Sequence, residues 1–331
     1  MRLLFIILIL LVAGLFVAGL TVGPADTGFT EALAALVNGG DGPLPLVMRE
    51  IRLPRALLAV MVGAGLGLSG AALQGYLRNP LAEPGLIGVS NAAALGAVVV
   101  IHAGLVASGT LALPFAALGG ALIGVFLVLA LAGAQGGSLT LILAGIAISA
   151  LAGALTSLVL NLSPNPFAAS EIVFWMMGSL ADRSIVHVGL LLPFVLVGGA
   201  MILSLARGLD ALTLGEDAAE TMGYSLTRLR LVLVIGVAAI VGGATAVAGA
   251  IGFVGLVVPH ILRPFVGAQP SRLLWASALG GAVMLQMADI LVRVILPERD
   301  LKLGVVTAIV GAPLFLHLIV KTRRESGGGL A

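Results

Sequence analysis

Long apolar runs, separated by short polar breaks, occupy most of the chain. Eight of them have about the length of a membrane-spanning helix and cover residues 3–20, 56–77, 86–102, 112–132, 139–160, 188–206, 273–292 and 303–320. A further stretch, residues 231–262, contains no Asp, Glu, Lys or Arg, is too long for one helix and is interrupted by glycines. We predict two helices there, joined by a tight turn near Ala248. The pattern therefore predicts an all-α polytopic membrane protein with about ten transmembrane helices in a single domain, residues 1–331.

The composition agrees with lipid as the main solvent of the chain. Of the 331 residues, 60% are hydrophobic and 10% are charged, whereas about 25% of the residues in a soluble domain are charged. The 87 residues between Glu83 and Glu171 include no Asp, Glu, Lys or Arg. The 46 glycines favour close packing of helices through small residues four positions apart, such as Gly63 and Gly67, with Gly70 further along the same run.

Basic residues give the expected orientation. The cluster Lys321-Thr322-Arg323-Arg324 and the long polar segment at residues 207–230 both belong in the cytoplasm under the positive-inside rule. Ten helices with both termini cytoplasmic satisfy this, and they place ten basic residues inside and seven outside. The bias is modest, so the outside arginines need an explanation.

Several functions are excluded or disfavoured. No block of Lys or Arg could follow a nucleic acid backbone, so nucleic acid is not an expected partner. The chain has no cysteine, no HExxH motif and no paired carboxylates within a helix, so we expect no catalytic residues, no metal site and no cofactor. It also lacks a phosphate-binding loop, and therefore any ATPase must be a separate subunit.

An ion-coupled secondary transporter is the alternative reading. Such a transporter usually keeps an ionisable side chain near the middle of the bilayer, and no predicted helix interior holds one. Asp289 comes nearest, but it lies four residues before Arg293 near a helix end, where an ion pair is the simpler interpretation.

Four segments carry a more specific signal. The first is RLPR at residues 52–55, followed by Ser69-Gly70, Gln74 and RNPLAEPGLIGVS at 78–90. The others are WMMGSL at 175–180, GFVGLVVPHILR at 252–263, and GVVTA with GAPLF at 304–308 and 311–315. In this order and spacing the chain resembles, over nearly its whole length, the FecCD-type permeases of type II ABC importers for vitamin B12, ferric siderophores and haem.

The resemblance implies a permease subunit in the bacterial inner (plasma) membrane that imports a metal chelate. It also implies a homodimer with its path at the subunit interface, two copies of an ABC ATPase, a periplasmic substrate-binding protein and surrounding membrane lipid as partners. Which chelate is carried stays open, because a path between apolar helices leaves no readable ligand pattern.

The same resemblance assigns roles to particular residues. Arg52, Arg55 and Arg293 are expected to dock acidic residues of the binding protein, and the alternative is that they anchor helix ends or, for Arg293, pair with Asp289. Residues 212–224 match the coupling helices that contact the ATPase. A bulky residue at either glycine of this segment is expected to misfit the helix turn, because its Cβ would clash at a close approach. The coupling residues are Leu212, Gly215, Glu216, Ala219, Met222 and Gly223, and the cytoplasmic gate residues are Asn79, Leu81, Ser138 and Leu139.

Overall fold

The computed structural model describes residues 1–23, 28–38, 42–105, 111–133, 137–163, 166–295 and 301–327, and these form helices and connecting segments without any strand. Seven candidate membrane spans are long and apolar enough to cross a bilayer. They are α1 (Arg2–Thr21), α4 (Leu53–Tyr76) with the preceding α3 (Pro43–Leu46) and π-helical η1 (Val47–Arg52), α6 (Ala112–Ala132), α7 (Ser138–Asn161), α9 (Ile185–Ser204), α12 (Leu226–Ala248) and α14 (Pro270–Ile295).

Shorter helices complete the bundle. The apolar helices α5 (Val89–His102), α13 (Val254–Leu262) and α15 (Leu303–Gly327) lie where the three remaining spans were predicted, and their described apolar parts are shorter than those of the seven candidates. The other short elements are α2 (Phe29–Asn38), η2 (Pro84–Ile87), α8 (Pro166–Met176), α10 (Ala206–Leu212), α11 (Glu216–Thr221) and η4 (Arg263–Val266). The predicted all-α fold is confirmed, and α2 is a helix that the sequence pattern did not predict.

The division of residues 231–262 is confirmed as well. Helix α12 ends at Ala248, and its C-cap Gly249 has φ 73°, a left-handed conformation that favours glycine. Helix α13 starts again at Val254. The turn predicted near Ala248 therefore coincides with the end of α12 and the positive φ of Gly249.

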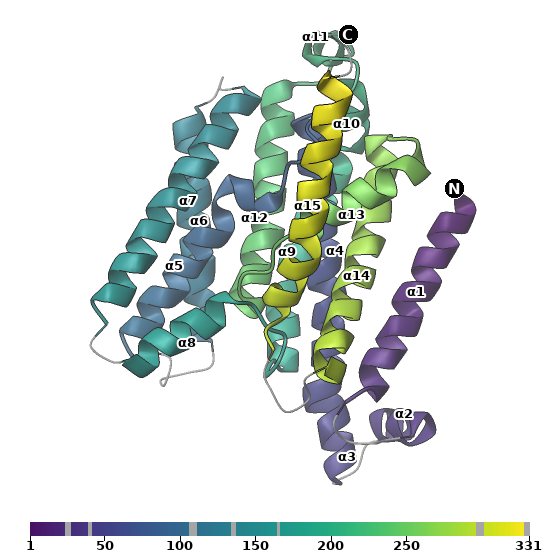
Figure 1. Ribbon diagram of the computed structural model, residues 1–331, viewed down its shortest axis with the longest axis vertical. Helices are drawn as coiled ribbons and strands as arrows, with labels where there is room; N and C mark the ends of the chain where they lie inside the picture. The colour runs from purple at the N-terminus through teal and green to yellow at the C-terminus, as the bar shows by residue number, and fades with distance from the viewer. Residues whose placement is uncertain are drawn as a thin grey trace.

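The two ends of the bundle differ in shape (Figure 1). We call them the α11 end, where α11 projects, and the α2 end, where α2 and α3 lie. The start of α1 and the end of α15 both point towards the α11 end, as an even number of spans requires. That this end faces the cytoplasm stays a prediction. The described side chains of α15 stop at Leu316, so those of the cluster Lys321–Arg324 lie outside the described part.

Glycines bring the central helices into backbone contact, as the sequence indicated. A Cβ on Gly63 would clash with the carbonyl oxygen of Gly281, and one on Gly67 would clash with that of Ser277, so α4 and α14 approach closely. A Cβ on Gly70 would likewise clash with the carbonyl oxygen of Gly255 on α13. Helix α4 is thus the centre of the bundle.

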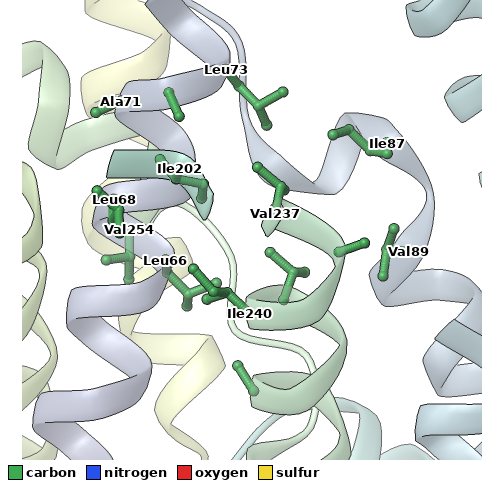
Figure 2. Packing of buried hydrophobic residues seen from close by; sticks show 14 of the residues in the cluster. Leu66, Leu68, Ala71, Leu73, Ile87, Val89, Ile202, Val237, Ile240 and Val254 are labelled. Atoms are coloured by element: carbon green, nitrogen blue, oxygen red, sulfur yellow. The ribbon is translucent and has the colours of Figure 1, made fainter. Parts of the chain in front are cut away.

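The hydrophobic core surrounds α4 (Figure 2). Leu66, Leu68 and Leu73 of α4 belong to one buried cluster with side chains of α9, α12 and α13, including Ile202 and Ile240. The same cluster takes in Ile87 and Val89 on either side of Gly88. This core holds the non-helical segment between α4 and α5 in place.

Candidate functional site

The backbone is broken between α4 and α5. Arg78 has φ 48°, which ends α4, and the amide of Leu81 then donates to Asn79 Oδ1 at 2.9 Å. The amide of Ala82 donates to the Asn79 carbonyl at 3.1 Å. Proline at 80 and 84 prevents an immediate return to helix. The α5 helix therefore starts only after Gly88, which has φ 79°.

A second break lies opposite the first, between α12 and α13. Phe253, the residue before α13, has φ 67°, and its amide donates to Glu83 Oε1 at 2.6 Å. A Cβ on Gly255 would contact the Pro84 ring at 2.6 Å, so the two segments also pack closely. Irregular backbone is tolerated at membrane depth only where protein or a water-filled cavity satisfies its polar groups. Each break therefore provides some of the protein contacts that the other break needs.

Gln74 joins the same two segments from α4. Its Nε2 lies within hydrogen-bonding distance of the carbonyl oxygens of Ala82, Gly255 and Leu256, at 3.2–3.3 Å. Its Oε1 accepts from Arg263 Nη2 at 2.6 Å. Gln74 is buried, so its amide replaces water for carbonyls that the helix breaks leave free.

The predicted gate residues all lie at the α11 end. Asn79 is exposed, Leu81 and Ser138 are half-buried, and Leu139 at the start of α7 is exposed. A side-chain hydrogen bond joins Ser138 to Tyr76 at the end of α4. The two parts of the predicted gate are therefore connected through α4, and their gating role stays a prediction.

The predicted coupling segment contains the last residue of α10 and the whole of α11, and α11 projects from the bundle (Figure 1). Leu212 and Ala219 are buried, so these two residues hold the segment together rather than present a surface. Glu216, Met222 and Gly223 are exposed, and Gly215 is half-buried.

The chain itself makes no close approach at Gly215 or Gly223, and a close approach of the ATPase there stays a prediction. No atom of the chain lies within 4 Å of a Cβ built on Gly215 or Gly223. Their φ angles of 112° and 89° are the constraint instead, because side chains with a Cβ rarely adopt them. Within this chain, glycine is needed to turn the backbone before and after α11, and not to allow a close approach.

Polar contacts connect the coupling segment to the bundle. Arg78 Nη2 lies 3.6 Å from Glu216 Oε1, so the start of α11 is beside the break that follows α4. Asp210 on α10 accepts from the amide of Ser271 at 2.8 Å and from Gln269 Nε2 at 3.0 Å. A carboxylate at that position satisfies a free amide in the first turn of α14.

The three predicted docking arginines lie together at the α2 end. Arg52 is buried and donates from Nη1 to the carbonyl oxygens of Leu20 and Thr21, both at 3.0 Å. Arg293 donates to the carbonyl oxygen of Gly19 at 2.7 Å. These contacts satisfy carbonyl groups in the last turn of α1 that have no partner within the helix.

Asp289 completes this cluster. It is buried on α14 and accepts from Arg55 Nε at 2.8 Å and from Arg293 Nη2. The predicted pair between Asp289 and Arg293 is therefore present. The Arg55 side chain keeps 19% of its surface exposed, against 7% for that of Arg293. Docking stays a prediction for all three arginines, and the cluster has in addition a role in holding α1 against α4 and α14.

An open cavity of about 490 Å³ lies between the end of α8, the turn after α12 and the start of α15. Its lining is made of small and flexible side chains, namely Met176, Met177, Ala250, Gly304, Val305, Ala308, Ile309 and Ala312. A Cβ on Gly304 would lie 2.9 Å from the carbonyl oxygen of Ala250, so backbone polar groups border this face. Within the described ranges, no three His, Cys, Asp or Glu side chains gather as a metal site requires.

The chain belongs to the FecCD transport family, whose model matches residues 7–321. It is 37% identical over 317 residues to the Fe(3+)-citrate import system permease protein YfmE of Bacillus subtilis, covering 95% of this chain and 92% of that one. It is 38% identical over 279 residues to the vitamin B12 import system permease protein BtuC of Citrobacter koseri, covering 84% of each.

A solved structure has the same fold. The inward-facing structure of a metal-chelate type ABC transporter superposes with a TM-score of 0.86 at 32% identity, covering 97% of this chain and all of that one. The predicted family and the type II importer permease fold are confirmed. The family consists of transport permeases and not of enzymes, and the chain is a multi-pass membrane protein.

The sequence interpretation assigned no role to three residues that organise the site. Glu83 and Gln74 were noted as parts of motifs, and Asp210 was not singled out. A carboxylate at the edge of a long uncharged region is costly to bury unless it is paired, and that signal could have identified Glu83 as a residue in need of a partner.

Proposed function

We propose that this chain is the membrane-spanning permease subunit of an ABC importer in the bacterial inner membrane. Two copies form the path for a metal chelate, which is a ferric siderophore, haem or cobalamin. A periplasmic binding protein delivers the chelate, and two copies of a separate ABC ATPase drive the transport.

The contact between Arg78 and Glu216 carries the proposal. It places the projecting helix α11 directly beside the broken segment at residues 78–88, so a partner that moves α11 also displaces the break. An exposed pair of this kind contributes only about 0–1 kcal/mol. Its importance is therefore its position between a docking surface and the predicted gate.

The face around the Met176–Ala312 cavity supports a homodimer. Backbone polar groups border this open face, and lipid offers them no hydrogen bonds. A second copy of the chain and a water-filled path between the copies satisfy both the carbonyls and the apolar side chains. The Met, Gly and Ala lining also suits a bulky, variable chelate, since methionine adapts its shape easily.

The assembly is tested by purifying the chain with its cognate ATPase and weighing the complex by native mass spectrometry. We expect two copies of each. Exchanging the exposed Met222 for Glu should weaken binding of the ATPase, whereas exchanging Leu316, an exposed residue of α15, for Met should not. If both variants retained the ATPase equally, α11 would not be the contact with the ATPase.

For the binding protein, Arg55 gives the cleanest test of the three arginines. Arg52→Glu would place a carboxylate beside buried carbonyl groups and disturb α1 directly. Arg55→Gln removes a half-buried charge, while Arg293 continues to neutralise Asp289. We expect slower association with the binding protein and a weaker salt dependence of that rate. Arg228→Gln at the opposite end is the control, and identical association rates in both variants would leave Arg55 with a packing role alone.

A further inference from the structure

Helix α2 has three distinct faces. Ala32 and Ala35 are buried in a cluster with Leu20 of α1, Met48 of η1 and Ala56 of α4. Because this buried face fixes the rotation of the helix, the exposure of its other faces is defined.

The second face is an exposed apolar stripe. Phe29, Leu33 and Val37, spaced by four residues, keep 55%, 48% and 69% of their surface exposed. The third face is polar, with Glu31 and Asn38 exposed on it. Polar and apolar exposed faces on one short helix are the pattern of a helix that lies in a membrane surface.

The position of α2 along the bundle agrees with this. Helix α1 has 20 residues, which is about 30 Å or the thickness of the hydrocarbon layer, so its last turn lies at the bilayer boundary. Helix α2 follows close to that turn and runs across the bundle axis (Figure 1). The elements that contact α2, which are α1, α3 and η1, also expose apolar side chains, at Val17, Leu46 and Ile51.

We propose that α2 is an interfacial anchor, with the stripe of Phe29, Leu33 and Val37 inserted among the lipid acyl chains next to the headgroups. The occupant is lipid, because α2 follows the last turn of α1, a membrane-spanning helix whose side chains at Leu10 and Val17 are apolar and exposed. Arg49 donates to the carbonyl oxygens of Leu36 and Val37 at 2.8–3.2 Å and so connects α2 to η1, which ends at Arg52. The anchor thus holds the arginine cluster at a fixed depth.

The absence of natural cysteines allows a direct test. Nitroxide labels are attached to single cysteines at Leu33 or Val37 on the stripe and at Glu31 or Asn38 on the polar face, in the full chain in phospholipid nanodiscs. Leu10 on α1 provides the lipid reference, and Asp217 on α11 provides the aqueous reference. Accessibility to oxygen, which enters lipid, is compared with accessibility to a water-soluble nickel complex.

We expect the oxygen-to-nickel ratio at Leu33 and Val37 to be several-fold higher than at Glu31 and Asn38, and close to that at Leu10. Ratios on the stripe equal to that at Asp217 would overturn the proposal, because the stripe would then face water. Labels on the stripe that neither reagent reaches would also overturn it, since a protein partner would then cover this face. The proposal depends on the membrane location of the chain and not on its transport substrate.

Discussion

Glu83 accepts a 2.6 Å hydrogen bond from the backbone amide of Phe253, a residue 170 positions further along the chain. Each residue belongs to a place where a membrane helix is interrupted. The bond therefore joins the interruption after α4 to the interruption before α13, and the two behave as one unit. If one segment moves, either this hydrogen bond breaks or the other segment moves with it.

Removing the Glu83 carboxylate should destabilise this unit. Glu83→Ala leaves the partly buried amide of Phe253 without its partner, at a cost of up to about 1–3 kcal/mol. Glu83→Gln keeps an acceptor and should lose less. Thermal unfolding of the purified chain in detergent measures both, and an unchanged midpoint for Glu83→Ala would show that the bond contributes nothing to the fold.

Packing of α4 on α14 gives a prediction with a matched control. Gly67→Ala puts a Cβ onto the carbonyl oxygen of Ser277, and Gly119→Ala on α6 meets no atom within 4 Å. Overpacking typically costs about 1–3 kcal/mol, so Gly67→Ala should lower the unfolding temperature and Gly119→Ala should leave it unchanged or higher. Equal temperatures would contradict the close approach of these helices.

Asp289 balances two arginines in a largely buried site. Asp289→Ala leaves the Arg55 and Arg293 charges without their carboxylate, a change that costs about 3–5 kcal/mol for buried pairs. We expect poor recovery of folded protein and an early unfolding transition. The exposed Glu220→Ala serves as the comparison, and similar stability of the two variants would mean that Asp289 is not needed to hold α1.

The turns around α11 should matter for coupling more than for stability. Gly215→Ala and Gly223→Ala force a side chain into left-handed backbone, which costs about 1–3 kcal/mol at an exposed site and shifts α11. The assembled complex should then hydrolyse ATP without matching uptake. If ATP consumed per chelate imported stays at the wild-type value in both variants, α11 does not carry the coupling.

Apolar periodicity was sufficient to predict the spans, including the division near Ala248, because lipid requires long apolar helices and Gly249 marks the stop. It did not predict α2, a short helix whose faces are defined only by packing on Leu20 and Met48. Hydrophobicity also could not show that Glu83 and Phe253 meet, since nothing in either local sequence specifies a partner so far away.

The sequence likewise predicted some features of the candidate site and missed others. The motifs located the gate and coupling segments at one end of the bundle, which the arrangement of α10 and α11 supports. They did not show that Gly215 and Gly223 have positive φ angles, because φ angles cannot be read from a sequence. They assigned Arg52 and Arg293 to docking, with anchoring of helix ends as the alternative. They could not show that both donate to α1 carbonyls, which only the folded chain brings near.

The most direct test of the account is uptake by reconstituted vesicles. The chain is incorporated with its ATPase, and binding protein loaded with a ferric siderophore, haem or cobalamin is added on the side opposite α11. We predict uptake of one of these chelates only when ATP and the ATPase are both present, with no response to a proton or sodium gradient. Uptake by the chain alone, driven by such a gradient, would contradict the account and make this protein an ion-coupled transporter.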